Sequence, residues 1–263
     1  MELRRSLKVL AIGNSFSVDS MQWIYPIAKD CGVEEIVLGN LYIGGCSLSM
    51  HWDNAVHDCA AYIYYKNTDG SWTEESDRTI QYGIKDEKWD IITLQQVSGL
   101  SGIESTYNSD LDHLIEYVHA NKTNAEVKLA WHMTWAYQSD SDHPNFSNYN
   151  NNQSIMYHSI CRAVQNKIVP NNEFFMVIPV GTAIQNVRTS IIGDTLTRDG
   201  FHLSVNLGRY IAGMTWVCSL TGLSIDNVTY VPSTEDIPEE YLPIIKNAVK
   251  AAVKKPFEVT VIG

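Results

Sequence analysis

Hydrophobic and polar positions follow two patterns along the chain, and each pattern predicts a different element. Short runs rich in Val, Ile and Leu predict buried strands; they cover residues 8–13, 34–43, 89–96, 126–133 and 172–180. Longer segments with apolar residues at helical spacing predict helices; they cover residues 20–31, 47–57, 76–86, 107–121, 150–168, 203–221 and 238–254. Alternating strands and helices are typical of a parallel sheet with helices on both faces. We therefore predict an α/β fold, a three-layer sandwich around a central five-stranded parallel sheet.

One segment departs from this alternation. Residues 61–75 read AYIYYKNTDGSWTEE, with Thr68-Asp69-Gly70 at the place of a tight turn. We predict a small β-hairpin inserted at the edge of the sheet. Because no repeats or low-complexity linkers divide the chain, we expect a single domain over residues 1–263.

Charge and hydropathy exclude several classes of protein. The chain has 19 basic and 30 acidic residues and a net charge of −11, whereas nucleic-acid-binding proteins present clustered Lys and Arg. No apolar run approaches the ~18 residues that a membrane-spanning helix needs. We expect neither a nucleic-acid partner nor a membrane span, and the sequence does not define the oligomeric state. The first residues have no signal-like apolar core, so we expect a cytoplasmic protein, or a periplasmic or secreted one if a leader preceded it.

The sequence does not indicate a metal or cofactor site. The five cysteines show no Cys-x-x-Cys spacing, and an odd number cannot form a complete disulfide set. Asp140, Asp142 and His143 match no metal-ligand spacing and are typical of a solvated loop. We expect no metal and no organic cofactor.

A serine directly follows the first predicted strand. The sequence KVLAIG continues into Asn14-Ser15-Phe16-Ser17, so Ser15 is expected at the carboxyl end of a buried strand, where open α/β sheets bind ligands. The turn into the next helix brings backbone N–H groups near this hydroxyl, and such groups stabilise the anion that forms in acyl transfer. Taken alone, a helix-capping serine explains the pattern equally well.

A base and an acid for this serine are available near the C-terminus. Serine is a weak nucleophile that needs a base, and the base needs an orienting acid. His202 follows Asp199 by three residues, at the start of a predicted helix. The turn at Gly200 lets the carboxylate approach one ring nitrogen. In isolation, an Asp-x-x-His sequence is more typical of a cap and a surface histidine.

Together these two segments resemble a known family. Gly13-Asn14-Ser15-Phe16-Ser17 and Asp199-Gly200-Phe201-His202 look like the first and last blocks of the SGNH (GDSL-type) hydrolases. The resemblance implies that Ser15 is the nucleophile and that Asp199 and His202 complete a catalytic triad.

The remaining blocks of that family supply oxyanion donors. The resemblance implies the backbone N–H of Ser15 and that of Gly45, which stands where the family has a glycine after its second strand. The third block departs from the family, because Gln95 and Gln96 stand where Gly-x-Asn-Asp is usual. A branch among carbohydrate-active esterases resembles this chain in having glutamine there, and a glutamine amide offers the same N–H donor. Since successive strand residues face opposite ways, we expect one of the two to serve, and we favour Gln95.

These assignments predict a serine ester hydrolase that removes short acyl groups, acetyl above all, from a carbohydrate. His51, Trp52 and Trp135 are candidate substrate contacts, since aromatic faces with polar tips suit sugar rings; core packing is the alternative for each. Two other functions stay open. One is a lipase or thioesterase acting on longer acyl chains, and the other is an inactive carbohydrate-binding protein of the same fold.

Overall fold

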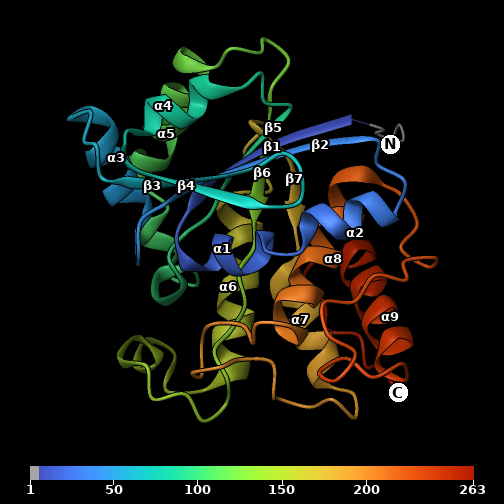
Figure 1. Ribbon diagram of the computed structural model, residues 1–263. Helices are drawn as coiled ribbons and strands as arrows, with labels where there is room; N and C mark the ends of the chain where they lie inside the picture. Colours follow the sequence, from blue (N-terminus) through green and yellow to red (C-terminus); the bar gives the residue numbers. More distant parts are fainter. Residues whose placement is uncertain (1–5) are drawn as a thin grey trace.

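A mixed seven-stranded sheet forms the centre of the molecule (Figure 1). The computed structural model describes residues 6–263. The strands are β1 (Ser6–Gly13), β2 (Glu35–Tyr42), β3 (Tyr62–Asn67), β4 (Trp72–Arg78), β5 (Ile91–Leu94), β6 (Lys128–His132) and β7 (Phe174–Ile178). Their spatial order is β4-β3-β2-β1-β5-β6-β7. The pairs β2–β1, β1–β5, β5–β6 and β6–β7 are parallel, and β2–β3 and β3–β4 are antiparallel.

The prediction of a five-stranded parallel sheet is therefore wrong in its count. The five predicted strands are all present, but the hairpin at 61–75 pairs with β2 through Leu38–Tyr42 and extends the sheet by two antiparallel strands. The reason is that β2 would otherwise be an edge strand with unpaired backbone groups, and a neighbouring hairpin satisfies them. The hairpin turns at Gly70, which has a φ of +105° that suits glycine.

Helices cover both faces of the sheet. The α-helices are α1 (Ser15–Met21), α2 (Ile24–Asp30), α3 (Leu48–Val56), α4 (Ile80–Asp86), α5 (Ser109–Asn121), α6 (Gln153–Lys167), α7 (Val180–Arg188), α8 (Leu207–Thr221) and α9 (Tyr241–Lys254). Short 3₁₀ helices are η1 (Ser98–Leu100), η2 (Glu104–Thr106) and η3 (Pro144–Tyr149). In Figure 1, α3, α4 and α5 lie on one side of the sheet, and α1, α2, α8 and α9 lie on the other. No helix of residues 6–263 is long and apolar enough to cross a membrane.

The helix predicted over 20–31 is in fact two helices. Helix α1 begins earlier, at Ser15, because the Asn14 side chain accepts a hydrogen bond from the Phe16 N–H and caps it. The chain breaks after α1 because Pro26 has no N–H to donate to the carbonyl of Gln22, four residues before it. That carbonyl accepts a hydrogen bond from Trp72 Nε1 of the hairpin instead, at 3.5 Å.

The strand order creates a switch point at the carboxyl end of β1. From β1 the chain crosses to β2 on one side, and later it returns to β5 on the other side. Crevices in open α/β sheets lie at such reversals. Residues that follow β1, above all Asn14 and Ser15, therefore lie at the place where this fold leaves room for a ligand.

Candidate active site

The turn after β1 presents the Ser15 hydroxyl. Asn14 organises this turn, since its Oδ1 accepts the Phe16 N–H at 3.0 Å and its Nδ2 donates to the Cys46 carbonyl at 3.0 Å. The first bond lies within the turn after β1, and the second connects this turn to the turn after β2. Asn14 is buried and Ser15 is partly exposed, so the hydrogen bonds of Asn14 lie beneath the Ser15 hydroxyl and support it.

The loop at 197–204 brings an acid and an imidazole to this hydroxyl. His202 Nε2 lies 2.8 Å from Ser15 Oγ, and His202 Nδ1 lies 2.7 Å from Asp199 Oδ2. A carboxylate oxygen can only accept, so Nδ1 carries the proton and Nε2 is left to accept the Ser15 O–H. The order acid, imidazole, hydroxyl is the one that nucleophilic serine requires.

The Asp199 carboxylate is held in its charged form. Its Oδ1 accepts the backbone N–H groups of His202 at 2.7 Å and Phe201 at 3.2 Å, while Oδ2 accepts from the His202 ring. Partial burial raises the pKa of Asp199, but these hydrogen bonds outweigh it and hold the pKa of the carboxyl below its ordinary value. Asp199 is therefore a fixed anion that sets the ring orientation of His202.

A buried carboxylate, Asp19, joins this loop to the helix that carries Ser15. Asp19 is fully buried on α1, four residues after Ser15. It accepts the Leu203 N–H at 2.8 Å and pairs with Arg198 at 3.1 Å and Arg209 at 2.7 Å. Leu203 and Arg198 flank the Asp199–His202 segment, so Asp19 grips both sides of that segment. Asp19 was not among the residues predicted from the sequence, although it stands one helical turn after the candidate nucleophile.

A cavity of about 420 Å³ opens over Ser15 and His202. Besides these two, it is lined by Asn14, Phe16, Tyr42, Gly44, Gly45, Val97, Ser98, His143, Asn145, Arg198 and Phe201. The lining comes from the segments after β1, β2 and β5 and from the loops around η3 and residue 200. Most of these residues are polar or small, and the purely apolar side chains among them are Phe16, Val97 and Phe201. The cavity has room for a small acyl group beside a polar alcohol.

The Gly44–Gly45 turn offers backbone to this cavity. Gly45 has a φ of +64°, a left-handed conformation that favours glycine, and a Cβ there would meet no atom within 4 Å. Among the residues that the structure describes, the backbone N–H groups of Ser15 and Gly45 have no hydrogen-bond acceptor. Unpaired N–H groups at the edge of a cavity are suited to receive an oxyanion.

The two glutamines after β5 lie elsewhere, contrary to their predicted role. Gln95 is buried; its Nε2 donates to Asn14 Oδ1 at 2.9 Å, and its Oε1 accepts from His132 Nδ1 at 2.8 Å. Gln96 Nε2 donates to the carbonyl and hydroxyl of Thr106, at 3.2 and 3.1 Å. Neither glutamine lines the cavity. Gln95 instead supports Asn14 from below.

The Gln95 amide belongs to a buried chain of hydrogen bonds under the site. The far nitrogen of the His132 ring, Nε2, accepts from Ser20 Oγ of α1 at 3.1 Å. Burial lowers the pKa of His132 to about 3, which keeps the ring neutral. The chain Ser20, His132, Gln95 and Asn14 thus connects α1 and the ends of β5 and β6 to the turn at Ser15.

The three candidate substrate contacts are also placed differently from the expectation. His51 is buried, with Nδ1 2.9 Å from the Tyr62 hydroxyl, and burial lowers its pKa to about 3. Trp52 packs against the His113 ring at 4.9 Å. Neither lines the cavity, and both serve the packing of α3.

Trp135 lies directly beneath the site and is fully buried. Its ring stacks on Phe16 at 4.0 Å, and its Nε1 donates to the Phe201 carbonyl at 2.7 Å. It therefore supports the residues next to Ser15 and His202 rather than facing the cavity.

His143 faces the cavity, although its sequence neighbourhood suggested a solvated loop. Its Nδ1 accepts the Asn145 N–H at 3.2 Å, so in the neutral ring Nε2 carries the proton and can donate to a ligand. Partial burial and the nearby His202 lower the pKa of His143. The only hint in the sequence is that the Asn- and Ser-rich patch closely follows the end of a predicted strand.

The described residues include potential metal ligands and five cysteines. Within residues 6–263, no three His, Cys, Asp or Glu side chains gather closely enough to hold a metal ion. Cys31, Cys46, Cys59, Cys161 and Cys218 are all free. Burial raises the pKa of the Cys46 thiol, which follows Gly45 in the chain, and so disfavours its thiolate form.

Comparisons with known proteins show where this fold and sequence recur. A DUF4886 protein from Bacteroides uniformis ATCC 8492 is 41% identical, with a TM-score of 0.92 and 97% of each chain covered. A proposed SGNH hydrolase from Slackia heliotrinireducens is 17% identical, with a TM-score of 0.51 over 82% of this chain and 99% of that one. LAE5, an α/β hydrolase enzyme from the metagenome of Lake Arreo in Spain, is 10% identical, with a TM-score of 0.50 over 82% and 95%.

The two distant structures show a shared α/β fold, similar to that of SGNH hydrolases. No protein with a curated function matches the chain. The family model described as "Domain of unknown function (DUF4886)" matches residues 8–252, which is nearly the whole chain. This protein belongs to the DUF4886 family.

Proposed function

We propose that this protein is a serine ester hydrolase that removes short acyl groups, such as acetyl, from carbohydrates. One observation carries the proposal: Ser15 Oγ, His202 and Asp199 form a continuous hydrogen-bonded series with separations of 2.8 and 2.7 Å. The three residues come from opposite ends of the chain. A capping serine and a surface histidine have no reason to meet in this order.

The reaction follows from the protonation states. His202 Nε2 takes the proton of Ser15 as Oγ attacks the ester carbonyl, and Asp199 stabilises the imidazolium that forms. When the tetrahedral intermediate collapses, the same nitrogen returns the proton to the leaving alcohol. A water molecule then repeats the sequence on the acyl-serine and releases the acid.

The oxyanion is bound by backbone donors. The N–H groups of Ser15 and Gly45 border the cavity and are unpaired among the described residues. Removing one donor of this kind typically costs about 100- to 1000-fold in rate. Gln95 acts indirectly in this proposal, because it holds Asn14, which fixes the turns that carry both donors.

The cavity favours a short acyl group on a polyhydroxy alcohol. A long acyl chain requires a continuous apolar groove, whereas the apolar lining here consists of Phe16, Val97 and Phe201 around a small space. His143 and Asn145 offer side-chain hydrogen-bond donors on the same wall. Such donors suit the hydroxyl groups of a sugar.

Two assays test this function. A fluorophosphonate probe should label the wild-type protein and the Ser49→Ala variant, whose substituted serine is exposed on α3, but not Ser15→Ala. Acetate release from acetylated sugars and from p-nitrophenyl acetate should fall to background in Ser15→Ala. A folded wild-type protein that is neither labelled nor active on any of these esters would contradict the proposal and favour a binding protein of the same fold. Preference for long-chain esters would favour the lipase or thioesterase alternative.

A further inference from the structure

A series of hollows leads away from Ser15 along α1. Ser15, Val18 and Gln22 are spaced by three and four residues, so they lie on one face of this helix and its C-cap. Ser15 lines the cavity described above, Val18 lines a smaller hollow of about 190 Å³, and Gln22 lines both that hollow and a wider one of about 670 Å³. The three hollows therefore follow one exposed helix face in order.

The hairpin forms the opposite wall of this path. Tyr65 of β3 and Trp72 of β4 line the small hollow, and Gly70 at the hairpin turn lines the wide one. Tyr65 also packs against Tyr42 of the Ser15 cavity, with ring centroids 6.0 Å apart. At the far end a Cβ on Gly70 would touch the Tyr25 ring at 3.4 Å. The hairpin thus walls the small and the wide hollow, and its Tyr65 contacts a residue that lines the Ser15 cavity. We call this row of three hollows the groove.

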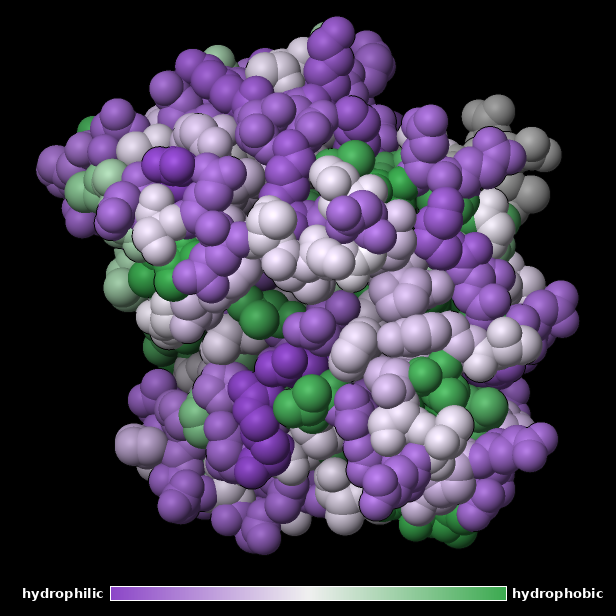
Figure 2. All heavy atoms as spheres, in the orientation of Figure 1, coloured by the Kyte–Doolittle hydropathy of each residue, from purple (hydrophilic) through white to green (hydrophobic). Residues whose placement is uncertain are grey.

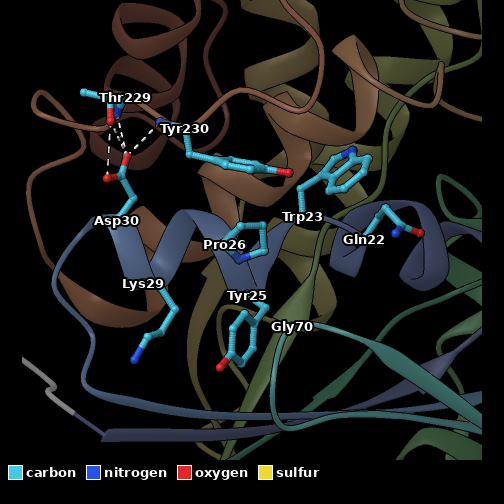
Figure 3. A pocket seen from close by; sticks show the side chains of 9 residues that line it. All are labelled: Gln22, Trp23, Tyr25, Pro26, Lys29, Asp30, Gly70, Thr229 and Tyr230. Atoms are coloured by element: carbon cyan, nitrogen blue, oxygen red, sulfur yellow. Dashed lines mark hydrogen bonds between the residues drawn. The ribbon is translucent and has the colours of Figure 1, made fainter.

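Aromatic rings dominate the wide hollow (Figure 3). Trp23 and Tyr230 lie on one side of it, Tyr25 lies on the side of Gly70, and Pro26 lies between them. Trp23 is held by a hydrogen bond from Nε1 to the Val205 carbonyl at 2.9 Å. Figure 2 shows the same face, on which side chains of intermediate hydropathy gather over α2. The rings are partly exposed, so they present apolar faces to solvent.

Polar groups border these rings. The polar residues Gln22, Lys29, Asp30 and Thr229 also line the wide hollow, and none of its lining residues is Leu, Ile, Val or Met. The Thr229 hydroxyl donates to Asp30 at 3.2 Å, and the Lys29 amine donates to the Glu34 carbonyl at 2.7 Å. An acyl chain or an apolar helix would be met by aliphatic side chains. Aromatic faces with donors and acceptors at their edges instead match a sugar ring, which has C–H faces and a rim of hydroxyl groups.

We propose that this groove binds the chain of a polysaccharide whose ester reaches Ser15, an inference that rests on the proposed function. Trp23 and Tyr25 are the stacking residues, and Gln22, which lines both the small and the wide hollow, binds hydroxyl groups. Gln22, the C-cap of α1, lies seven residues after Ser15, about 10 Å along the helix at ~1.5 Å per residue, and Trp23 follows it. A single sugar cannot span both sites, so the groove predicts a substrate of several linked sugars.

The test compares polymers with single sugars. Substrates are acetylated xylan and acetylated glucomannan, the acetylated monosaccharides xylose and mannose, and p-nitrophenyl acetate. Wild-type protein should have a kcat/KM at least about tenfold higher on one polymer than on its monosaccharide. Trp23→Ala and Tyr25→Ala should each lose about tenfold on that polymer, the loss typical of a truncated aromatic contact, and keep wild-type activity on p-nitrophenyl acetate. Tyr82→Ala, which truncates a partly exposed ring on α4, is the matched control and should change neither activity.

The outcomes separate the groove from the ester hydrolysis. If neither polymer is preferred over its monosaccharide, or if the groove variants reduce all activities alike, the groove proposal is overturned. If no ester is hydrolysed, native-gel retardation by deacetylated xylan and glucomannan still tests the groove in the wild-type protein. Retardation that Trp23→Ala and Tyr25→Ala abolish would support polysaccharide binding, and absence of retardation by both polymers would contradict it.

Discussion

Asp19 offers a sharp test of how the site is held together. The substitution Asp19→Asn keeps the size of the side chain and can still accept the Leu203 N–H. It removes the negative charge between Arg198 and Arg209, which lie 3.1 and 2.7 Å from the same carboxylate oxygen. Removing one partner of a buried ion pair typically costs ~3–5 kcal/mol. The two arginine side chains are 36% and 15% exposed, so water partly solvates them and the low end applies.

We therefore expect Asp19→Asn to lower the free energy of unfolding by about 3 kcal/mol. For a chain of this size that corresponds to a decrease in Tm of about 6–12 °C. Urea unfolding followed by tryptophan fluorescence measures the first quantity, and a thermal melt measures the second. At a temperature where the variant is folded, we also expect kcat on p-nitrophenyl acetate to fall at least about tenfold, because the loop that carries His202 is no longer gripped and small displacements are costly.

The control for this substitution is Asp226→Asn, which removes an exposed carboxylate paired with Lys250 at 2.6 Å. Exposed ion pairs contribute little to stability, so the midpoint of unfolding should stay at the wild-type value. If the free energy of unfolding of Asp19→Asn is within about 1 kcal/mol of the wild-type value and kcat is unchanged, then the reasoning that Asp19 fixes the loop is refuted.

Three further predictions concern Asp199, Gln95 and Asp194; Asp194 does not line the Ser15 cavity and pairs with Arg188 at 2.7 Å. Asp199→Asn should reduce kcat/KM on all esters by about 10⁴-fold with little change in Tm, because an amide that donates to His202 Nδ1 forces the proton onto Nε2. Steady-state kinetics and a thermal melt measure the two quantities. Retained activity would contradict this role of Asp199. Gln95→Leu should lower the free energy of unfolding in urea by about 2 kcal/mol and should also lower kcat, because the buried Asn14 side chain loses one hydrogen bond. An unchanged kcat would show that Gln95 does not help to position the turn at Ser15. Burial raises the pKa of Asp194, but Arg188 and hydrogen bonds from the Ser139 N–H and the Gln153 amide outweigh it and hold that pKa below its ordinary value. The contribution of Asp194 to stability is therefore present above the unfolded pKa of ~3.9 and is lost as the pH falls through the lower folded value. The difference in urea midpoint between the wild-type protein and Asp194→Asn should accordingly shrink as the pH decreases from about 5 to about 2.

Local patterns were enough to predict much of this molecule. Short apolar runs identified the five parallel strands, because a strand buried on both faces must be apolar along its length. The same patterns located the hairpin and most helices. They predicted one helix where the structure has α1 and α2, although Pro26 explains the break between them. They also missed α7, whose apolar residues continue directly from β7.

The sequence by itself determined which groups are available: a serine after the first strand, an Asp-x-x-His loop near the end and glycines after the second strand. Only the tertiary structure decided which side chains meet. Gln95 was expected to face the ligand, yet its amide bonds to Asn14 and His132, which lie 81 and 37 residues away in the chain. Contacts between distant parts of the chain also decide three other features. They are the ion pairs of Asp19, the groove along the hairpin and the position of Trp135 beneath Phe16. The physical reason is that periodicity reports burial, whereas the direction of a polar side chain is set by the partners that satisfy its hydrogen bonds, and those partners are brought close only by folding.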